Sequence, residues 1–161
     1  MKKYWLMKSE PSNYSIHDLQ KEKKSLWDGV RNYQARNFMM KDMKVGDMVL
    51  FYHSLANPPG IAGLAEVSGE ARPDPTATNP KSKYYDPKAT KKNPRWHCVE
   101  VIFKKVFKNF ISIEMLRAEQ KLKSMLVLKK GQRLSIMPVQ KTEFDHIIKL
   151  SNRTIKHSDI S

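Results

Sequence analysis

The chain has 161 residues, of which 40% are hydrophobic and 29% are charged, and its formal net charge is +14. This composition is too apolar for a disordered chain, and no apolar run is long enough to cross a bilayer. Because a chain of this length suits one core, we predict a single domain over residues 1–150 and a flexible C-terminal tail over residues 151–161.

The first half of the chain predicts three strands and two helices. The apolar segment Tyr4–Lys8 runs into a proline turn and is typical of a strand. Ser15, followed by an acid three residues later, predicts a capping box and a helix to about residue 23. A second helix is expected over Asn32–Met43. Met48–His53 and Ile61–Val67 are rich in strand formers and are expected to pair as a hairpin.

The second half begins with a long loop and ends in a helix. Residues 71–94 hold five of the nine prolines and show no periodicity, so they predict a long ordered or semi-ordered loop, of a kind that is commonly functional. The strongest strand signal follows at Trp96–Phe107. The remaining expected elements are short helical turns at Ser112–Arg117 and Leu122–Leu128, a strand over Arg133–Val139, and a last helix capped by Thr142.

The order of these elements favours one fold class. About five to six strands alternate irregularly with short helices, without a repeated strand–helix–strand rhythm. We therefore predict an α+β domain built on a small mixed β-barrel with short flanking helices. Barrels of this size bind ligands at their mouths and loops.

The positive charge is concentrated in the second half. Residues 1–80 carry 11 Lys and Arg against 9 Asp and Glu, whereas residues 81–161 carry 19 against 7. Such an excess favours polyanions, because each neutralised phosphate releases counterions. Nucleic acid, either DNA or RNA, is therefore the expected partner; the alternative is that the lysines only solvate the surface. No segment pairs a basic face with an apolar one, so no membrane partner is expected.

The single cysteine and the N-terminal residues indicate the cellular setting. Cys98 cannot form an internal disulfide, and the start of the chain lacks the apolar core of a signal peptide. We therefore expect a cytoplasmic monomer, associated with the nucleoid if the protein is bacterial.

Several short motifs, in a fixed order, resemble one family. They are Tyr4–Pro11, Trp27–Asn37, Val45–Asp47, Phe51–Ser54, Gly63 with Val67, Asp74–Pro75, Tyr84–Pro87, Pro94–Trp96 and Arg133–Val139. On these motifs the chain resembles the EVE domain family, a branch of the PUA-like barrels. The resemblance implies a barrel similar to that of the YTH readers of methylated adenine in RNA, and a reader of modified bases in DNA or RNA.

A pocket for an extruded base needs an aromatic wall, polar groups for the base edge and cations for the flanking phosphates. The residues that we assign to the base pocket are Ser9, Glu10, Trp27, Val30, Asn32, Tyr52, His53, Ser54, Tyr84 and Tyr85. The residues that we assign to phosphate binding are Lys8, Arg31, Arg36, Lys83, Lys88, Arg95 and Arg133.

Most of these residues also have a structural interpretation. Trp27 stands beside a bend and can be a pocket wall or a core residue. Asn32 can pair with a base edge or cap a helix. His53 can contact the ligand or serve as a structural hydrogen-bond partner. Ser9 and Glu10 can face the barrel mouth or form a turn. Tyr84 and Tyr85 can form a lid or an ordinary surface loop.

The sequence supports an enzymatic function less than it supports a base reader. One cysteine and scattered histidines cannot build a zinc deaminase or another metal site, and no glycine-rich phosphate loop is present, so we expect no metal, cofactor or catalytic residue. Cys98 lies within a strand and is expected to be inert. The remaining alternatives are a nucleic-acid-processing enzyme that uses Glu10, Asp28 and His53 as acid–base groups, and a module that binds a small molecule or a protein.

Overall fold

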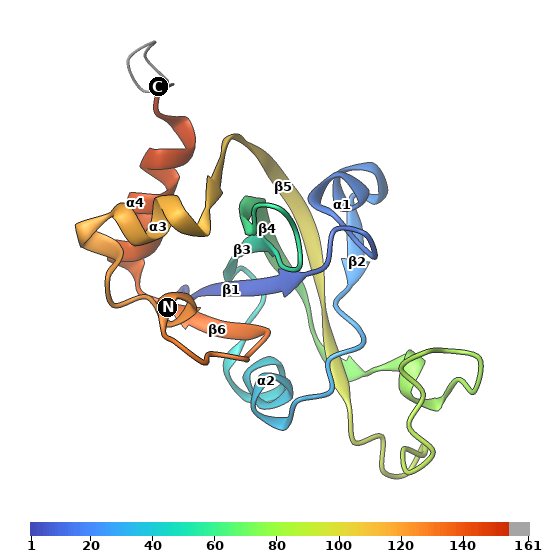
Figure 1. Cartoon of the computed structure of the whole chain (residues 1–161). Helices are drawn as coiled ribbons and strands as arrows, with labels where there is room; N and C mark the ends of the chain where they lie inside the picture. Colours follow the sequence, from blue (N-terminus) through green and yellow to red (C-terminus); the bar gives the residue numbers. More distant parts are fainter. Residues whose placement is uncertain (155–161) are drawn as a thin grey trace.

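Six strands form one mixed sheet in the order β2-β5-β4-β3-β1-β6, shown in Figure 1. The computed structural model describes residues 1–154, so most of the predicted tail lies outside the described residues. The strands are β1 (Tyr4–Ser9), β2 (Lys24–Leu26), β3 (Met48–His53), β4 (Gly60–Pro73), β5 (His97–Ser112) and β6 (Ile136–Val139).

The sheet coils like a barrel without closing. β3, β4 and β5 pair antiparallel, whereas β1 runs parallel to β3 and antiparallel to β6. The register between β4 and β5 shifts at several points, and such bulges increase the bend and twist of long strands. β2 and β6 are the two edges of the sheet, and these two described strands do not pair with each other. The predicted α+β class and strand number are confirmed, with an open sheet in place of a closed barrel.

The predicted helix starts follow from local hydrogen bonds. α1 (Ile16–Glu22) begins at Ser15, which forms the predicted capping box with Asp18. α2 (Tyr33–Asn37) begins at Asn32, whose Oδ1 accepts from the Ala35 amide at 3.0 Å. The helix then widens into a π-helical turn, η1 (Phe38–Asp42). Both helices are therefore confirmed, and Asn32 has the capping role.

The remaining helical elements lie in the second half of the chain. They are η2 (Pro75–Thr78), α3 (Ile113–Ala118), η3 (Gln120–Leu122), η4 (Leu126–Leu128) and α4 (Lys141–Asn152). In Figure 1, α3 and α4 lie together on one side of the sheet, and α1 and α2 lie elsewhere around it. Within the part of the chain that the structure describes, no helix is long and apolar enough to span a membrane.

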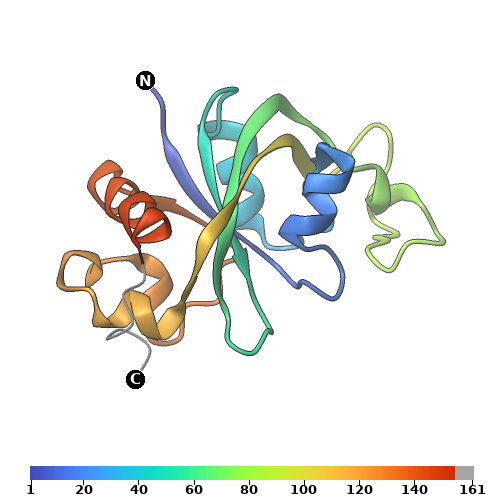
Figure 2. The ribbon, with the colours of Figure 1, turned by 90° about the horizontal axis from the view of Figure 1, so that it is seen from above.

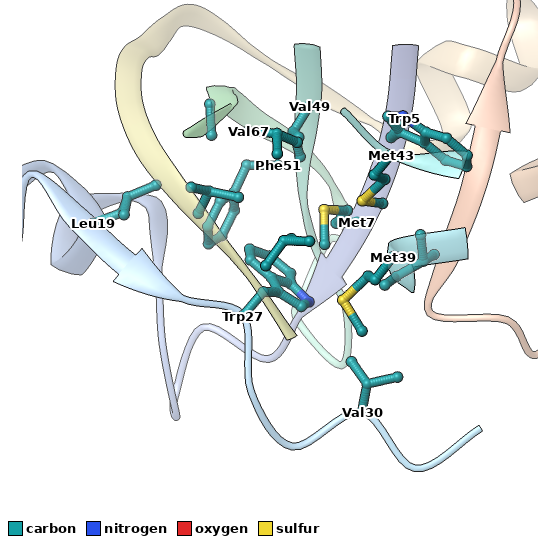
Figure 3. Close-up of a cluster of buried hydrophobic side chains, with 14 of the residues drawn as sticks. Trp5, Met7, Leu19, Trp27, Val30, Met39, Met43, Val49, Phe51 and Val67 are labelled. Carbon is teal, nitrogen blue, oxygen red and sulfur yellow. The ribbon is translucent and has the colours of Figure 1, made fainter. Parts of the chain in front are cut away.

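Alternation along the strands divides the core between the two faces of the sheet. Met7 and Phe51 belong to the cluster shown in Figure 3, which also contains Trp27. Their neighbours Leu6 and Tyr52 belong to a second cluster, which packs against α4. Neighbouring residues of one strand therefore contribute to different clusters, one on each face of the sheet.

Several predicted boundaries were wrong because tertiary pairing overrides local signals. β4 and β5 continue to Pro73 and Ser112, since each provides the other's hydrogen-bond partners. β6 starts only at Ile136, and β2 was not predicted. The last helix is capped by Gln140, which forms a capping box with Glu143, and not by Thr142.

The tail also begins later than residue 151. α4 ends at Asn152, and Ser151 is buried with its hydroxyl donating to the Ile148 carbonyl at 2.7 Å. Asn109 on β5 donates to the carbonyls of Leu150 and Arg153 at 3.1 and 2.6 Å. These bonds satisfy carbonyl groups that a helix end leaves without a partner.

Asp47 ties the turn before β3 to the start of β1. The residue is 2% exposed. Its carboxylate accepts from the Trp5 indole Nε1, the Lys3 amide and the Lys44 amide, each at 3.0 Å. A buried carboxylate needs such donors, because an unpaired charge in the interior is costly. Asp47 therefore holds the starts of the two parallel strands, β1 and β3, next to each other.

We expect Asp47→Asn to lower the free energy of unfolding by roughly 2 kcal/mol, since one of three donors would face an amide NH₂ group in place of an oxygen. Urea unfolding followed by tryptophan fluorescence measures this change. Glu114→Gln, at a residue whose side chain is 77% exposed, is the matched control and should leave the midpoint unchanged. Equal midpoints for the two variants would contradict the role given to Asp47.

Candidate functional site

A cavity of about 660 Å³ opens beside the C-terminal end of β1. Its volume lies in the roughly 300–1,000 Å³ range of small-ligand pockets. Five segments contribute to it: the end of β1 with the loop that follows, the segment from the end of α1 to Arg31, the residue that follows β3, the loop after η2, and the approach to β6. The lining residues are Lys8, Ser9, Glu10, Asn13, Tyr14, Glu22, Ser25, Leu26, Trp27, Asp28, Gly29, Val30, Arg31, Ser54, Lys83, Tyr84, Arg133 and Ser135.

Trp27 is both a core residue and a wall of this cavity. It is 8% exposed and meets Phe51 edge to face at 5.3 Å between ring centroids. Its amide donates to the Val99 carbonyl at 2.8 Å, which extends the pairing of β2 with β5. Figure 3 shows Trp27 at the lower edge of the core cluster with Val30. The two interpretations of Trp27 are therefore compatible.

The bend after Trp27 brings Tyr84 against the cavity. Gly29 has φ +79, a left-handed conformation that residues with a Cβ rarely adopt. A Cβ at this position would lie 2.7 Å from two carbons of the Tyr84 ring. The ring can pack here only because Gly29 has no side chain. The Tyr84 ring is thus positioned by the bend that presents Trp27.

Asp74 holds the bend and the loop together. Its side chain is fully buried. It accepts from the Gly29 amide at 2.8 Å, from Arg31 Nη1 at 3.0 Å, and from the amide and hydroxyl of Thr76 at 2.8 and 2.6 Å. Burial acts to raise the pKa of Asp74, but the hydrogen bonds from Thr76, Gly29 and Arg31 outweigh it, and the pKa lies below its ordinary value.

Arg31 is used inside the protein. In addition to its bond with Asp74, its guanidinium donates to the Val30 and Tyr84 carbonyls at 2.8 and 2.7 Å and to the Thr76 hydroxyl at 3.1 Å. These bonds occupy the planar fork that would otherwise bind a phosphate bidentately. Arg31 lines the cavity, but its contacts give it the role of a clamp between the bend and the loop.

Arg36 and Arg95 lie outside the cavity in an aromatic stack. The Tyr33 and Trp96 rings are stacked at 4.8 Å, and the Arg36 guanidinium lies 4.6 Å from the Tyr33 centroid. Arg36 donates to the Arg95 carbonyl at 2.7 Å, and Arg95 pairs with Asp86 at 3.2 Å. Both arginines are therefore engaged in joining α2 to the loop before β5.

Three predicted phosphate ligands remain around the cavity, namely Lys8, Lys83 and Arg133. None of the three forms an ion pair within residues 1–154. Lys83 and Arg133 are exposed, while Lys8 is partly covered, and burial lowers the pKa of Lys8. Lys88 is exposed on the loop but does not line the cavity.

The cavity also presents carboxylates and hydroxyls. Glu10, Glu22 and Asp28 lie on its wall. Asp28 has much exposed surface, yet the atoms around its carboxylate desolvate it, and this burial together with the nearby Asp74 charge raises its pKa. The Tyr14 hydroxyl donates to Glu22 at 2.8 Å, and burial raises the pKa of Tyr14 to about 12. The cavity is therefore rich in hydrogen-bond acceptors.

Ser9 and Ser54 join the two strand ends at the mouth. The Ser54 amide donates to the Ser9 carbonyl at 3.0 Å, and the Ser9 hydroxyl donates to the Tyr14 carbonyl at 2.6 Å. The turn interpretation and the pocket interpretation of Ser9 thus coexist, as they do for Trp27. Glu10 likewise bonds within the turn, where it accepts from the Asn13 amide group at 3.1 Å.

Four residues assigned to the base pocket do not line the cavity, namely Asn32, Tyr52, His53 and Tyr85. Asn32 caps α2. Tyr52 points to the opposite face of the sheet from Trp27, as strand alternation requires. The His53 Nε2 accepts from the Ile16 amide at 3.1 Å at the start of α1, and burial lowers the pKa of His53. Tyr85 is 42% exposed beside Tyr84.

Eight lining residues were missing from the predicted site, namely Asn13, Tyr14, Glu22, Ser25, Leu26, Asp28, Gly29 and Ser135. All but Tyr14 and Glu22 lie within three positions of a residue that was predicted. The predicted helix ended at about residue 23, and no element was predicted for residues 24–26, so β2 and its contribution to the cavity were not recognised. Asp28 was considered only as a catalytic group.

Metal binding and thiol chemistry find no basis in this site. Among residues 1–154, no group of three or more His, Cys, Asp or Glu side chains is placed to hold a metal ion. Cys98 is fully buried in β5, and burial raises the pKa of its thiol to about 12. Such a thiol stays protonated at neutral pH and is a poor nucleophile.

The chain has relatives of known structure along nearly all of its length. The EVE domain model matches residues 3–150. Human thymocyte nuclear protein 1 is 40% identical over 169 residues, which cover 93% of this chain and 74% of that protein. Protein PSPTO5229 of Pseudomonas syringae is 46% identical, with a TM-score of 0.88 over 92% of this chain and 99% of its own.

Two of the similar structures contain nucleic acid. Human THYN1, in complex with 5-methylcytosine-containing DNA, superposes with a TM-score of 0.88 at 40% identity, covering 96% of this chain and 100% of that chain. The YTH domain of Zygosaccharomyces rouxii MRB1, in complex with N6-methyladenosine RNA, superposes with a TM-score of 0.56 at 13% identity, over 97% and 88%. The second likeness, at this low identity, is one of fold alone, and it agrees with the expected similarity to the fold of the YTH readers.

We expect Asp74→Asn to destabilise the protein by roughly 2–3 kcal/mol at pH 7, because a hydrogen bond from a charged partner is lost at a buried site. The folded pKa of Asp74 is depressed, so its stabilising contribution is complete above the unfolded value of about 4 and is lost as the pH falls through the folded pKa. Urea midpoints measured from pH 7 to pH 3 should therefore converge for the wild type and the variant at acid pH. Parallel pH profiles would contradict this account.

Gly29→Ala should displace Tyr84 and reduce the cavity. The new Cβ would require a left-handed backbone for alanine and would overlap the Tyr84 ring. We expect a loss of roughly 1–3 kcal/mol of stability, measured by thermal unfolding. The double variant Gly29→Ala/Tyr84→Ala removes the overlap and should cost less than the sum of the two single changes. Additive effects would show that the two positions are not in contact.

Proposed function

This chain belongs to the EVE domain family, and we propose that it is a non-catalytic reader that captures one modified base of DNA in the cavity beside Trp27. The observation that carries the proposal is a cavity with an aromatic wall, polar acceptors and a basic rim in a chain 40% identical to a human protein whose structure contains 5-methylcytosine DNA. The match over residues 3–150 also supports the proposal of one domain.

The apolar part of the wall suits a methylated base. Leu26, Trp27 and Val30 line one region of the cavity. An indole provides a surface on which a base can stack, and stacking on an aromatic side chain contributes roughly 1–3 kcal/mol per base. A methyl group placed against the apolar residues adds roughly 1–3 kcal/mol of discrimination. The cavity would therefore prefer, and not absolutely require, the methylated form.

The acceptors on the wall select among bases. Carboxylates accept hydrogen bonds from the exocyclic amino group that cytosine and adenine carry and thymine lacks. Asp28 adjoins Trp27 in the chain, so it is the carboxylate that we assign to this amino group. The atoms around the Asp28 carboxylate exclude part of its water. A hydrogen-bond donor on a bound base would therefore stabilise this carboxylate more than it would a fully hydrated one. This arrangement favours an amino-bearing base such as 5-methylcytosine.

The backbone of the nucleic acid would follow the basic rim. Lys8, Lys83 and Arg133 are the cavity cations that form no ion pair within the described part of the chain. The excess of positive charge in residues 81–161 extends this field. Such contacts give affinity that falls steeply with salt and does not depend on sequence.

The arrangement gives little support to a nuclease or an RNA-modifying enzyme. That alternative needs Glu10, Asp28 and His53 to act together on one substrate. The first two line the cavity, but the His53 Nε2 is occupied by the Ile16 amide. The three groups therefore do not act together on one bound substrate, and this alternative loses the acid–base set that it requires.

Cell location and oligomeric state stay predictions. The animal relatives bear the name of a nuclear protein, whereas the single cysteine led us to expect a cytoplasmic monomer. Both settings are compatible with a reader of nucleic acid.

Binding should depend on Trp27 and on salt. We expect Trp27→Ala to weaken binding to a DNA duplex with one 5-methylcytosine by roughly tenfold, because the stacking surface is lost. Fluorescence anisotropy with matched methylated and unmethylated duplexes, and with an N6-methyladenosine RNA, measures affinity and preference at two salt concentrations. Trp27→Phe should retain part of the methyl preference.

Met40→Ala is the matched control, since Met40 is an apolar residue, 41% exposed and outside the cavity lining. It should bind like the wild type. Failure of the wild type to bind any of these nucleic acids would refute the reader function, and turnover of the oligonucleotide would refute its non-catalytic character. A preference for the methylated RNA would move the substrate from DNA to RNA.

A further inference from the structure

Leu55 stands beside the cavity in an unusual state for a leucine. It is 84% exposed, although its side chain is large and apolar. Its φ is +48, in the left-handed region that residues other than Gly, Asn and Asp seldom adopt. Its chain neighbour Ser54 lines the cavity. The left-handed backbone does not favour leucine, and the exposed side chain gains nothing from burial in the core. Residues held in such rarely populated backbone conformations occur preferentially at functional sites.

The loop that carries Leu55 is held at both ends. The Ser54 amide donates to the Ser9 carbonyl at 3.0 Å, and the Ile113 amide donates to the Pro59 carbonyl at 2.9 Å. Gly60 packs so closely on β5 that a Cβ there would lie 2.3 Å from the Ile111 carbonyl oxygen. Figure 2 shows the loop between β3 and β4 projecting beyond the sheet. Leu55 is therefore presented outward from an anchored loop.

We propose that Leu55 is a wedge that enters the base stack of double-stranded DNA at the position from which the captured base departs. The inference rests on the proposed function and adds to it that the substrate is a duplex. Extruding a base from a duplex costs unpairing and unstacking. An apolar side chain inserted between base steps compensates for the lost contacts, and leucine is one of the residues that nucleic-acid-binding proteins use in this way.

The surroundings of Leu55 fit a stack of bases better than a protein surface. The other exposed residues of the loop, Asn57 and Pro58, are polar or small, so Leu55 is the one large apolar side chain that this loop exposes. A stable protein interface needs a much larger continuous area. Lys8, on the strand that adjoins the loop, lies on the cavity rim and is available to a phosphate next to the wedge.

The test compares duplex and single-stranded DNA. Leu55→Asn replaces the apolar side chain by a polar one that tolerates the left-handed backbone, so the fold is preserved. Leu55→Met keeps a large apolar side chain at this position. Val45→Asn is the matched control, because Val45 is 57% exposed in the turn at the other end of β3. Each protein is titrated with a 5-methylcytosine duplex and with the methylated strand alone.

We expect Leu55→Asn to weaken duplex binding by about tenfold relative to Val45→Asn and to leave single-strand binding unchanged, with Leu55→Met close to the wild type. A 2-aminopurine placed next to the methylated base should brighten on binding to the wild type and less with Leu55→Asn. Unchanged duplex binding, or equal losses on both substrates, would overturn the wedge and leave the reader intact. Absence of binding by the wild type would instead reject the reader function, and the wedge with it.

Discussion

One buried carboxylate organises the region on which function depends. Asp74 follows directly after β4, and its four hydrogen bonds join the bend at Gly29, the guanidinium of Arg31 and the first turn of η2. A charge removed from water must be fully paired, so its donors cannot drift apart without a large cost. The wall that carries Trp27 and the loop that carries Tyr84 are for this reason one rigid unit. The cavity lies beside these two segments, and the hydrogen bonds to Asp74 keep them in the positions that form its wall.

The same region shows that positive charge and ligand binding are separate properties. Three of the arginines that we assigned to phosphates bind groups within the protein, namely carbonyls, carboxylates and aromatic rings; they are Arg31, Arg36 and Arg95. Arginine suits this use because its planar group donates in several directions and stacks on rings. The cations that remain at the cavity are two lysines and Arg133. Net charge alone therefore overstates the number of groups free to contact a ligand.

The sequence predicted the elements better than the site. Caps, turns and strand formers act locally, so the starts of α1 and α2 and all of β3 could be predicted from short segments. The ends of β4 and β5 could not, because each depends on its partner. Trp27, Ser9 and Tyr84 were placed together by the resemblance. Tyr52 was assigned to the same wall as Trp27 but lies on the other face of the sheet, because its neighbour Phe51 is the residue that packs on Trp27, a contact that the sequence does not show. The sequence does not show that the His53 Nε2 accepts from the Ile16 amide, so it gave no reason to leave His53 out of the predicted base pocket.

The place of β1 in the sheet has a consequence for how the protein is made. Residues Tyr4–Met7 pair with Ile136–Val139, so the first strand of the chain is completed only by the last. Contacts so distant in sequence make folding slow compared with helical proteins of similar size. During synthesis β1 must wait, with an unpaired edge, until the residues of β6 have left the ribosome. The mouth of the cavity, which contains Ser9 at the end of β1, is therefore among the last parts of the nascent protein to form.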